Sequence, residues 1–255
     1  MSQPRIVALW SAPRCRSTAF LRMVAERGDF TVVHEPFSQL ADFGSAQVGP
    51  RTVTDVPAAV AALRDLAGTT PVFFKDTTDF AQPELLSDRE FLAEVAHAFV
   101  VRDPEAAIAS HFALNPDLTR DEVGFSRLAD IFDAVRDLGG REPFVFDADD
   151  LLEWPEGLVR DFCDWLGVEF LPHALSWQPG MLTDWRATSR WHEATSSTAG
   201  FAAPRRNHAV DVRSHPVLSG YLDHHLPHFR RLSAHCRRPA GDAHGLMSEP
   251  VGGAV

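Results

Sequence analysis

The stretch Arg5-Ile-Val-Ala-Leu-Trp-Ser-Ala-Pro-Arg-Cys-Arg-Ser-Thr18 decides the fold of this chain. Its apolar first part, residues 5–10, predicts a buried strand, and the segment from Ser17 to Val24 is typical of a helix. A short basic loop joins the two. The backbone N–H groups of such a loop and the positive end of the helix dipole both favour an anion. The sequence therefore predicts a phosphate or sulfate pocket directly after the first strand.

The side chains of this loop support the same prediction. Arg14 and Arg16 add positive charge, and Ser17 and Thr18 add hydroxyl donors. The loop lacks the two glycines and the lysine of the nucleoside triphosphate motif G-x-x-x-x-G-K-[ST], which disfavours an ATP or GTP hydrolase. A cysteine-phosphatase loop carries an arginine six residues after its cysteine. Six residues after Cys15 the chain has Leu, so we interpret Cys15 as a small residue that fills the loop.

Length and composition favour one large domain. The 255 residues are 45% hydrophobic, enough for a substantial core. We expect a single domain over residues 1–236, with a core at about 5–170 and an irregular covering segment at about 171–236. The Gly- and Pro-rich end, residues 237–255, is expected to be disordered. The three cysteines show no metal-ligand spacing and fit a reducing compartment.

Charge and hydropathy exclude two classes of partner. The net charge of −11 argues against a nucleic-acid surface, which needs an excess of basic residues. The chain has no apolar stretch of 18 residues, and its N-terminus enters the first strand almost directly, without a basic segment and an apolar run. We therefore expect a cytoplasmic protein with no membrane segment. The oligomeric state stays open, a homodimer included.

The alternation of patterns along the chain predicts an α/β fold, a parallel sheet flanked by helices on both faces. Apolar runs predict strands at 5–10, 30–34, 71–75, 97–101 and 143–147. Amphipathic segments predict helices near 17–27, 57–67, 84–96, 104–114, 121–138 and 156–166, with a last helix near 215–235.

Polar residues follow the predicted strands at the edge where parallel strands end together. His34 and Glu35 follow the second strand, and Lys75, the only lysine of the chain, ends the third. Arg102 follows the fourth strand, and Ser110 lies eight residues later on a helix started by Pro104. Ligands of open α/β sheets bind at this edge. We therefore expect these side chains to face one cleft together with the first loop.

These residues resemble the sulfotransferases that use 3′-phosphoadenosine 5′-phosphosulfate (PAPS). The resemblance rests on Arg14-Cys-Arg-Ser-Thr18, on Lys75 and on Val100-Val-Arg-Asp-Pro-Glu-Ala-Ala-Ile-Ala-Ser-His111. It continues in Val145-Phe-Asp-Ala-Asp-Asp-Leu-Leu152 and in the helix at 159–167. The chain is similar to bacterial members, and to the carbohydrate-type branch more than to the cytosolic aryl branch. The resemblance covers roughly residues 5–170 and implies the P-loop NTPase-like sulfotransferase fold.

By position, the resemblance implies a donor site in two parts. The loop would hold the 5′-phosphosulfate through Pro13, Arg14, Cys15, Arg16, Ser17 and Thr18, with Arg14 where many relatives have lysine. Arg102 and Ser110 would bind the 3′-phosphate. The late R-x-x-x-G-x-x-G-x-x-x-K segment of the cytosolic branch is missing. The segment around Gly200 and Phe201, with Arg205, is our candidate substitute.

The catalytic assignments follow from the chemistry of sulfuryl transfer, which needs in-line positioning and charge neutralisation more than covalent catalysis. Arg14 and Lys75 are the expected charge stabilisers. A hydroxyl acceptor must also lose a proton to a general base. Glu35 is the first candidate because it resembles the Glu-Pro after the second strand of carbohydrate sulfotransferases. His34 and His111 remain alternatives, and in a regular strand His34 and Glu35 would point to opposite faces.

The prediction is therefore an enzyme that moves a sulfuryl group from PAPS to a hydroxyl or amine of a small-molecule acceptor. The mechanism requires no metal. Two other readings stay open at this point. One is a kinase-like phosphotransferase that uses ATP, and the other is a nucleotide-binding protein without catalysis. The sequence does not distinguish a sugar, nucleoside, lipid or aromatic acceptor.

Overall fold

A five-stranded sheet forms the centre of the molecule, and all its strand pairs are parallel. The computed structural model describes residues 4–181, 189–201 and 210–237. The strand order is β2-β5-β1-β6-β7, made of β1 (Ile6–Ser11), β2 (Thr31–His34), β5 (Val72–Thr77), β6 (Val95–Val101) and β7 (Phe144–Asp147). This arrangement confirms the predicted α/β class and all five predicted strands.

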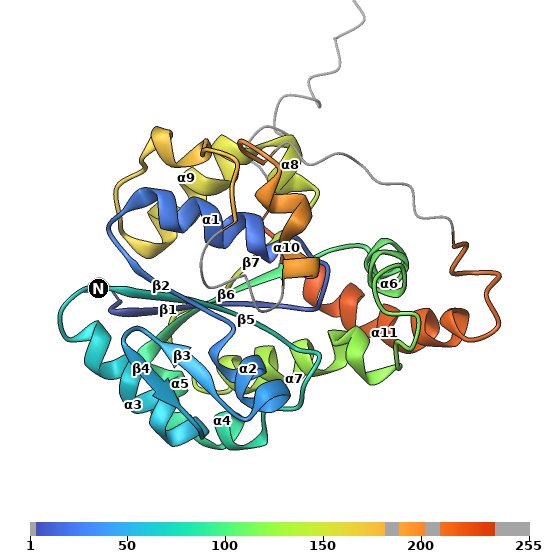
Figure 1. Cartoon of the computed structure of the whole chain (residues 1–255), viewed down its shortest axis with the longest axis horizontal. Coiled ribbons are helices and arrows are strands. Elements are labelled where there is room, and N and C mark those ends of the chain that lie inside the picture. Colours follow the sequence, from blue (N-terminus) through green and yellow to red (C-terminus); the bar gives the residue numbers. More distant parts are fainter. Residues whose placement is uncertain (1–3, 182–188, 202–209, 238–255) are drawn as a thin grey trace, which may run out of the picture.

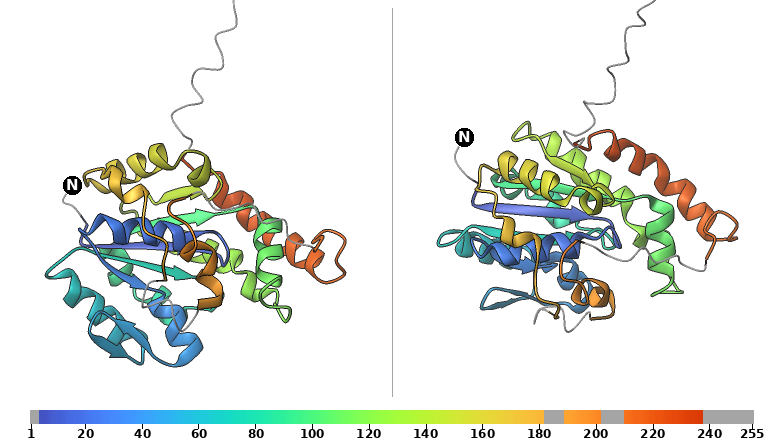
Figure 2. Two further views of the ribbon diagram at one scale, coloured as in Figure 1. Left: turned by 45° about the horizontal axis from the view of Figure 1, so that its top comes forward. Right: turned by 90° about the horizontal axis from the view of Figure 1, so that it is seen from above.

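Helices cover both faces of the sheet, as Figure 1 shows. One face carries α1 (Ser17–Arg27), α8 (Asp150–Glu153), α9 (Pro155–Leu166) and α10 (Ser189–Ser196). The other carries α2 (Pro36–Phe43), α3 (Val56–Ala67), α4 (Pro83–Ser87), α5 (Arg89–Glu94) and α7 (Phe125–Arg136). At one end, α6 (Pro104–Phe112) packs against α11 (Leu218–Ser233), which also lies along α7 (Figure 2).

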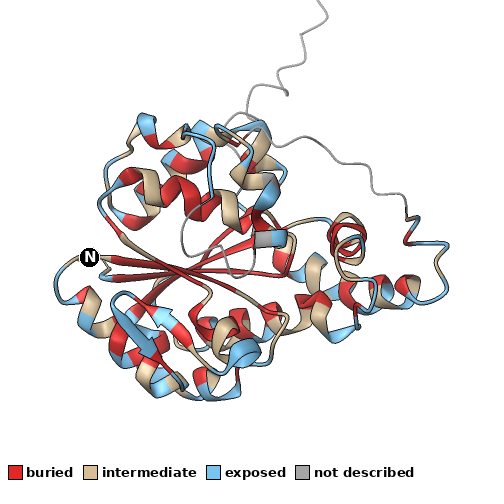
Figure 3. Ribbon diagram, viewed as in Figure 1, coloured by how far each residue is buried: buried red, intermediate tan, exposed pale blue. Residues whose placement is uncertain are grey.

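The two helical layers explain why the strands are apolar along their whole length. All six residues of β1 and all seven of β6 are buried, and in Figure 3 the central strands are buried throughout. A strand covered on both faces has no solvent side, so hydrophobic residues run continuously. His97 of β6 is a buried polar residue of the sheet. Its ring accepts a hydrogen bond locally, because Trp10 Nε1 of β1 donates to His97 Nδ1 over 2.9 Å.

Several elements differ from the sequence-based expectation. The helix expected near 84–96 is two short helices and the start of a strand, because the Asp88 side chain accepts from Phe91 N and begins α5 anew. A hairpin of β3 (Ala46–Val48) and β4 (Arg51–Val53) and the short α8 were not predicted. The covering segment is not irregular throughout, since it contains α10. No helix among the described residues is long and apolar enough to cross a membrane.

Helix α2 is absent from the helices predicted from the sequence, although Pro36 follows closely after the second strand. Pro36 occupies the first turn of the helix, where its missing N–H costs nothing. The helix N-terminus is bound by Asp76 of β5, whose carboxylate accepts from Phe37 N (2.7 Å), Ser38 N (3.1 Å) and Ser38 Oγ. A capping carboxylate supplied by another strand cannot be found from local sequence.

The chain topology places a crevice at the end of β1. β1 lies between β5 and β6. After β1 the chain continues to β2 on the β5 side of the sheet, and after β5 it crosses to β6 on the other side of β1. This is the switch point at which open α/β sheets bind ligands. The loops after β1, β2, β5 and β6 meet there.

The cap from Asp76 gives a test of the fold. Asp76→Ala should lower the free energy of unfolding by about 2–4 kcal/mol, because it removes a cap and leaves buried N–H groups unpaired. The matched control is Asp55→Ala, which removes an exposed cap on Ala58 N of α3 and should cost about 1 kcal/mol. Urea unfolding of the three proteins measures both. An equal or smaller loss for Asp76→Ala would contradict this role.

Candidate functional site

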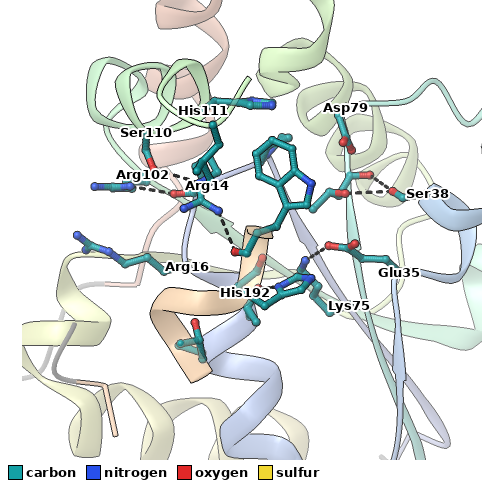
Figure 4. A pocket seen from close by; sticks show the side chains of 18 of the residues that line it. Arg14, Arg16, Glu35, Ser38, Lys75, Asp79, Arg102, Ser110, His111 and His192 are labelled. Carbon is teal, nitrogen blue, oxygen red and sulfur yellow. Dashed lines mark hydrogen bonds and ion pairs between the residues drawn. The ribbon is translucent and has the colours of Figure 1, made fainter. Parts of the chain in front are cut away.

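A cavity of ≈ 570 Å³ opens at the switch point. It is lined by residues from the loops after β1, β2, β5 and β6, and by α6, α10 and the segment after α10. The predicted site residues that line it are Pro13, Arg14, Arg16, Ser17, Thr18, Glu35, Lys75, Arg102, Ser110, Gly200 and Phe201. The structure thus brings together side chains that lie up to almost two hundred positions apart in the sequence (Figure 4).

The first loop presents an open helix N-terminus to the cavity. Arg14 (φ 67°) and Arg16 (φ 63°) both adopt the left-handed conformation, which non-glycine residues rarely do. Arg16 precedes α1, and no side chain of the described residues caps that helix. Ala19 N donates to the Arg16 carbonyl over 3.0 Å, so the N–H groups of Ser17 and Thr18 are the ones that the first turn can offer to a ligand. Ser11 Oγ donates to Ser17 Oγ over 2.8 Å and ties the strand end to the helix start.

Three arginines from two segments, the loop after β1 and the residue after β6, gather at this end of the cavity. Arg102 Nη1 donates to the Arg14 carbonyl over 2.9 Å, and Arg14 Nε donates to Ser110 Oγ over 3.1 Å. Arg16 forms an ion pair with Asp149. Nε of Arg102 is buried and has no hydrogen-bond partner among the residues that the structure describes. Arg14, Arg102 and Ser110 therefore form a connected, cationic end of the cavity.

Cys15 faces away from this end. Its side chain is fully buried and does not line the cavity, and burial raises the pKa of the thiol to about 12. A thiol that stays protonated is a poor nucleophile. The structure supports its interpretation as a loop-filling residue, and only its backbone could serve an anion.

Lys75 and Glu35 form a buried ion pair on the cavity wall. Glu35 N also donates to the Lys75 carbonyl over 2.7 Å, which extends the pairing of β2 and β5 by one residue. Burial, the largest single influence, would raise the pKa of Glu35. The Lys75 charge, His34, the hydrogen bond from Lys75 and His192 together outweigh burial and lower that pKa to about 2. Glu35 is therefore a carboxylate at neutral pH, held against an ammonium group.

His34 lies beside this pair, contrary to the expectation of opposite faces. β2 ends at His34, and Glu35 adopts a left-handed backbone conformation (φ 49°), which brings its side chain next to that of His34. As a result His34 Nε2 lies 3.4 Å from Glu35 Oε2. Glu35 lines the cavity but His34 does not. Burial lowers the pKa of His34 to about 4, so its imidazole is neutral.

His192 of α10 is a site residue that sequence reasoning missed. Its Nε2 lies 3.2 Å from His34 Nε2, and its Nδ1 lies 3.4 Å from Thr18 Oγ1. It therefore connects the covering segment to both the anion loop and the carboxylate. Burial and then the neighbouring His34 and Lys75 lower its pKa to about 3. One histidine among twelve, far away in sequence, carries no local signal for this position.

The third candidate base, His111, lies at the other side of the cavity. It follows Ser110 on α6 and faces the Trp191 ring at 5.3 Å. The Trp191 carbonyl accepts from Arg14 Nη1 over 3.0 Å. Burial lowers the pKa of His111 to about 4. α10 therefore lies over the site. Its Trp191 contacts Arg14 and His111, and its His192 contacts His34 and Thr18.

Two of the three residues predicted in the segment after α10 can be placed, and both lie at the cavity. Gly200 and Phe201 line it, and Phe201 packs edge-on against Trp177 at 5.4 Å. Gly200 is closely packed, because an added Cβ would lie 3.1 Å from the Leu175 carbonyl oxygen. Arg205 lies outside the described residues.

The fold and this site define a class of protein, and comparison with known sequences agrees. The model of the sulfotransferase domain family matches residues 4–225 of the chain. The chain therefore belongs to this family.

Individual relatives are distant. The chain is 25% identical over 262 aligned positions to branched-chain-amino-acid aminotransferase-like protein 1 of Arabidopsis thaliana, covering 98% of this chain and 45% of that protein. The chain thus spans less than half the length of the curated relatives it matches. Among solved structures, a sulfotransferase from Alicyclobacillus acidocaldarius aligns with a TM-score of 0.49 at 15% identity, over 93% of this chain and 98% of that one. Mouse sulfotransferase SULT7A1 complexed with PAP aligns with a TM-score of 0.48 at 12% identity, over 92% and 90%.

The histidine pair gives a direct test of the site. The rings of His34 and His192 should stay neutral from pH 8 to pH 5.5, because their pKa values lie near 4 and 3. NMR titration of the ring protons measures this, with signals assigned from the variants His34→Asn and His192→Asn. A ring that titrates near its ordinary pKa of about 6.5 would show that the pair is not buried as described.

Proposed function

We propose that this protein transfers a sulfuryl group from PAPS to a hydroxyl or amine of a small-molecule acceptor. One observation carries the proposal. The open helix N-terminus after β1 and the Arg102–Ser110 pair after β6 form two anion positions at the same end of one cavity. A donor that carries a 5′-phosphosulfate and a 3′-phosphate needs two such positions. ATP, with its phosphates in one chain, needs only one.

The two positions differ in chemistry in a way that suits this donor. The loop offers backbone N–H groups, Ser17 and Thr18, which can surround a terminal oxyanion. The other position offers the unpartnered Nε of Arg102 with the Ser110 hydroxyl. An arginine fork suits the geometry of a phosphate monoester. Because Arg102 is also bound to the Arg14 carbonyl, occupation of one position would stiffen the other.

The transfer then proceeds by in-line displacement at sulfur. The acceptor oxygen forms the new S–O bond while the bond from sulfur to the 5′-phosphate oxygen breaks. The electron pair leaves with 3′-phosphoadenosine 5′-phosphate (PAP), and the acceptor proton goes to the general base. Arg14 and Lys75 stabilise the charge that builds up on the leaving phosphate and the transferred group.

Glu35 is the base we favour. It lines the cavity, whereas His34 stands behind it, and it lies next to Lys75. A carboxylate of low pKa is a weak base, but the acceptor hydroxyl becomes strongly acidic as its oxygen bonds to sulfur. Proton transfer late in the reaction therefore needs only a well-placed acceptor atom. His111 is the alternative on the opposite side.

We propose that the reaction needs no metal. His34, Glu35 and His192 bring possible ligand atoms within 4.8 Å of one another. The Glu35 carboxylate is already paired with Lys75, and a divalent cation there would lie beside that ammonium group. Repulsion from that ammonium group disfavours a metal ion at this position, and it leaves the Glu35 carboxylate available as a proton acceptor.

Donor binding is the first test. Calorimetric titration should show that PAP binds in the micromolar range or tighter and that ATP binds far more weakly. Arg102→Ala should weaken PAP binding by about 10–100-fold, the effect of losing a charge-assisted phosphate contact. Arg120→Ala is the control, since Arg120 is exposed and does not line the cavity. Equal binding of ATP with magnesium, or no effect of Arg102→Ala, would favour the kinase-like reading.

The base is tested separately from the donor. Glu35→Gln should reduce turnover by about 10²–10⁴-fold, the usual contribution of a general base, while PAP affinity changes little. Turnover is measured as release of PAP from PAPS with the best acceptor of a small panel. The conservative amide keeps the size of the side chain. Unchanged turnover in Glu35→Gln would remove Glu35 from the mechanism and favour His111.

A further inference from the structure

Charge divides the cavity into two ends. Arg14, Arg16 and Arg102 lie on one side of it, and Glu35, Ser38 and Asp79 lie on the other (Figure 4). Lys75 is the one cation near the second side among the described lining residues, and its charge is engaged by Glu35. The first end suits a polyanionic donor. The second end, which would hold the acceptor, carries an excess of negative charge.

Asp79 is the most distinctive residue of this acceptor end. Its Oδ1 is buried and has no hydrogen-bond partner among the described residues, although the side chain lines the cavity. The backbone is fixed in place, because Arg127 of α7 donates to the Asp79 carbonyl. Burial, with Glu35 nearby, raises the pKa of Asp79 to about 6. A hydrogen bond with the Thr77 side chain opposes part of this rise, and a ligand cation beside the carboxylate would stabilise its charged form further.

The lining of the cavity also includes apolar residues. One face of α2 lines the cavity with Gln39, Asp42 and Phe43, spaced three and four residues apart as a helix face requires. Phe43 is 54% exposed, which is unusual for a large apolar side chain and places an aromatic ring at the cavity wall. Phe80 and Leu114 line the same cavity. These residues would contact an aromatic or aliphatic body, and Asp42 adds a second carboxylate.

We propose that the acceptor is a hydroxyl compound with an apolar body and a protonated amine that pairs with Asp79. The inference rests on the proposed sulfotransferase function and names the acceptor class of that same site. The hydroxyl lies at Glu35 and Lys75, the body against Phe43 and Phe80, and the ammonium group beside the Asp79 carboxylate. An anionic acceptor is disfavoured, because it would face Glu35, Asp42 and Asp79 with no cation left to pair with it at that end among the described lining residues.

Three phenols of matched size and different charge test this proposal: tyramine (cationic), 4-ethylphenol (neutral) and 3-(4-hydroxyphenyl)propionate (anionic). Each is incubated with the whole protein and PAPS, and the sulfated product is quantified. The expected order of kcat/KM is tyramine, then 4-ethylphenol, then the carboxylate, with about tenfold or more between the first and the last for a desolvated charge pair.

Variants assign the preference to one carboxylate. Asp79→Asn keeps the size of the side chain and should reduce the ratio of tyramine to 4-ethylphenol to near one, with PAP affinity unchanged. Asp117→Asn, an exposed carboxylate away from the cavity, is the control and should keep the wild-type ratio. Unchanged PAP affinity also shows that Asp79→Asn is folded.

The outcomes separate this inference from the proposed function. A protein that binds PAP but prefers the carboxylate, sulfates none of the three phenols, or keeps its preference in Asp79→Asn would overturn the acceptor class and leave the donor assignment standing. A protein that does not bind PAP would contradict the proposed function itself. The wild-type ranking tests the charge preference even if the variant does not fold.

Discussion

The structure depends on the burial of Lys75. Its side chain is 2% exposed in the middle of a parallel sheet, and a buried ammonium group requires an opposite charge close by. Glu35 supplies that charge only because the chain turns left-handed directly after β2. The same turn starts α2, whose N-terminus is bound by Asp76, the next residue after Lys75 on β5. One buried charge thus ties together two strands, a helix start and the wall of the site.

The site combines two electrostatic environments that a small volume rarely holds. The cationic end is built from an uncapped helix and arginines from separate strands, with Arg102 and Arg14 bound to each other through the backbone. The other end is acidic and partly apolar. Lys75 lies between them, paired with Glu35, so that neither end neutralises the other. Such a division suits a reaction between a polyanionic donor and an acceptor of different charge.

Much of this could be predicted from the sequence, and the missing parts have a common cause. The five strands and the polar residues at their ends follow from runs of apolar residues and from the rule that parallel strands end at one edge. Helix α2 and His192 could not be predicted in the same way. α2 depends on a cap from another strand, and His192 acts through partners more than a hundred residues away. Local patterns do not report contacts of that kind.

The sequence by itself determined the fold class, the basic loop after β1 and the grouping of Glu35, Lys75 and Arg102, since each of these lies next to a strand end. Ser110 joins them from the helix that follows Arg102. Only the tertiary structure decided which of these groups are charged, which line the cavity and which lie behind it. His34 and Glu35 are adjacent in sequence, yet Glu35 lines the cavity and His34 does not. The physical reason is that burial and the nearest opposite charge set the state of an ionisable group, and both are properties of the packed chain.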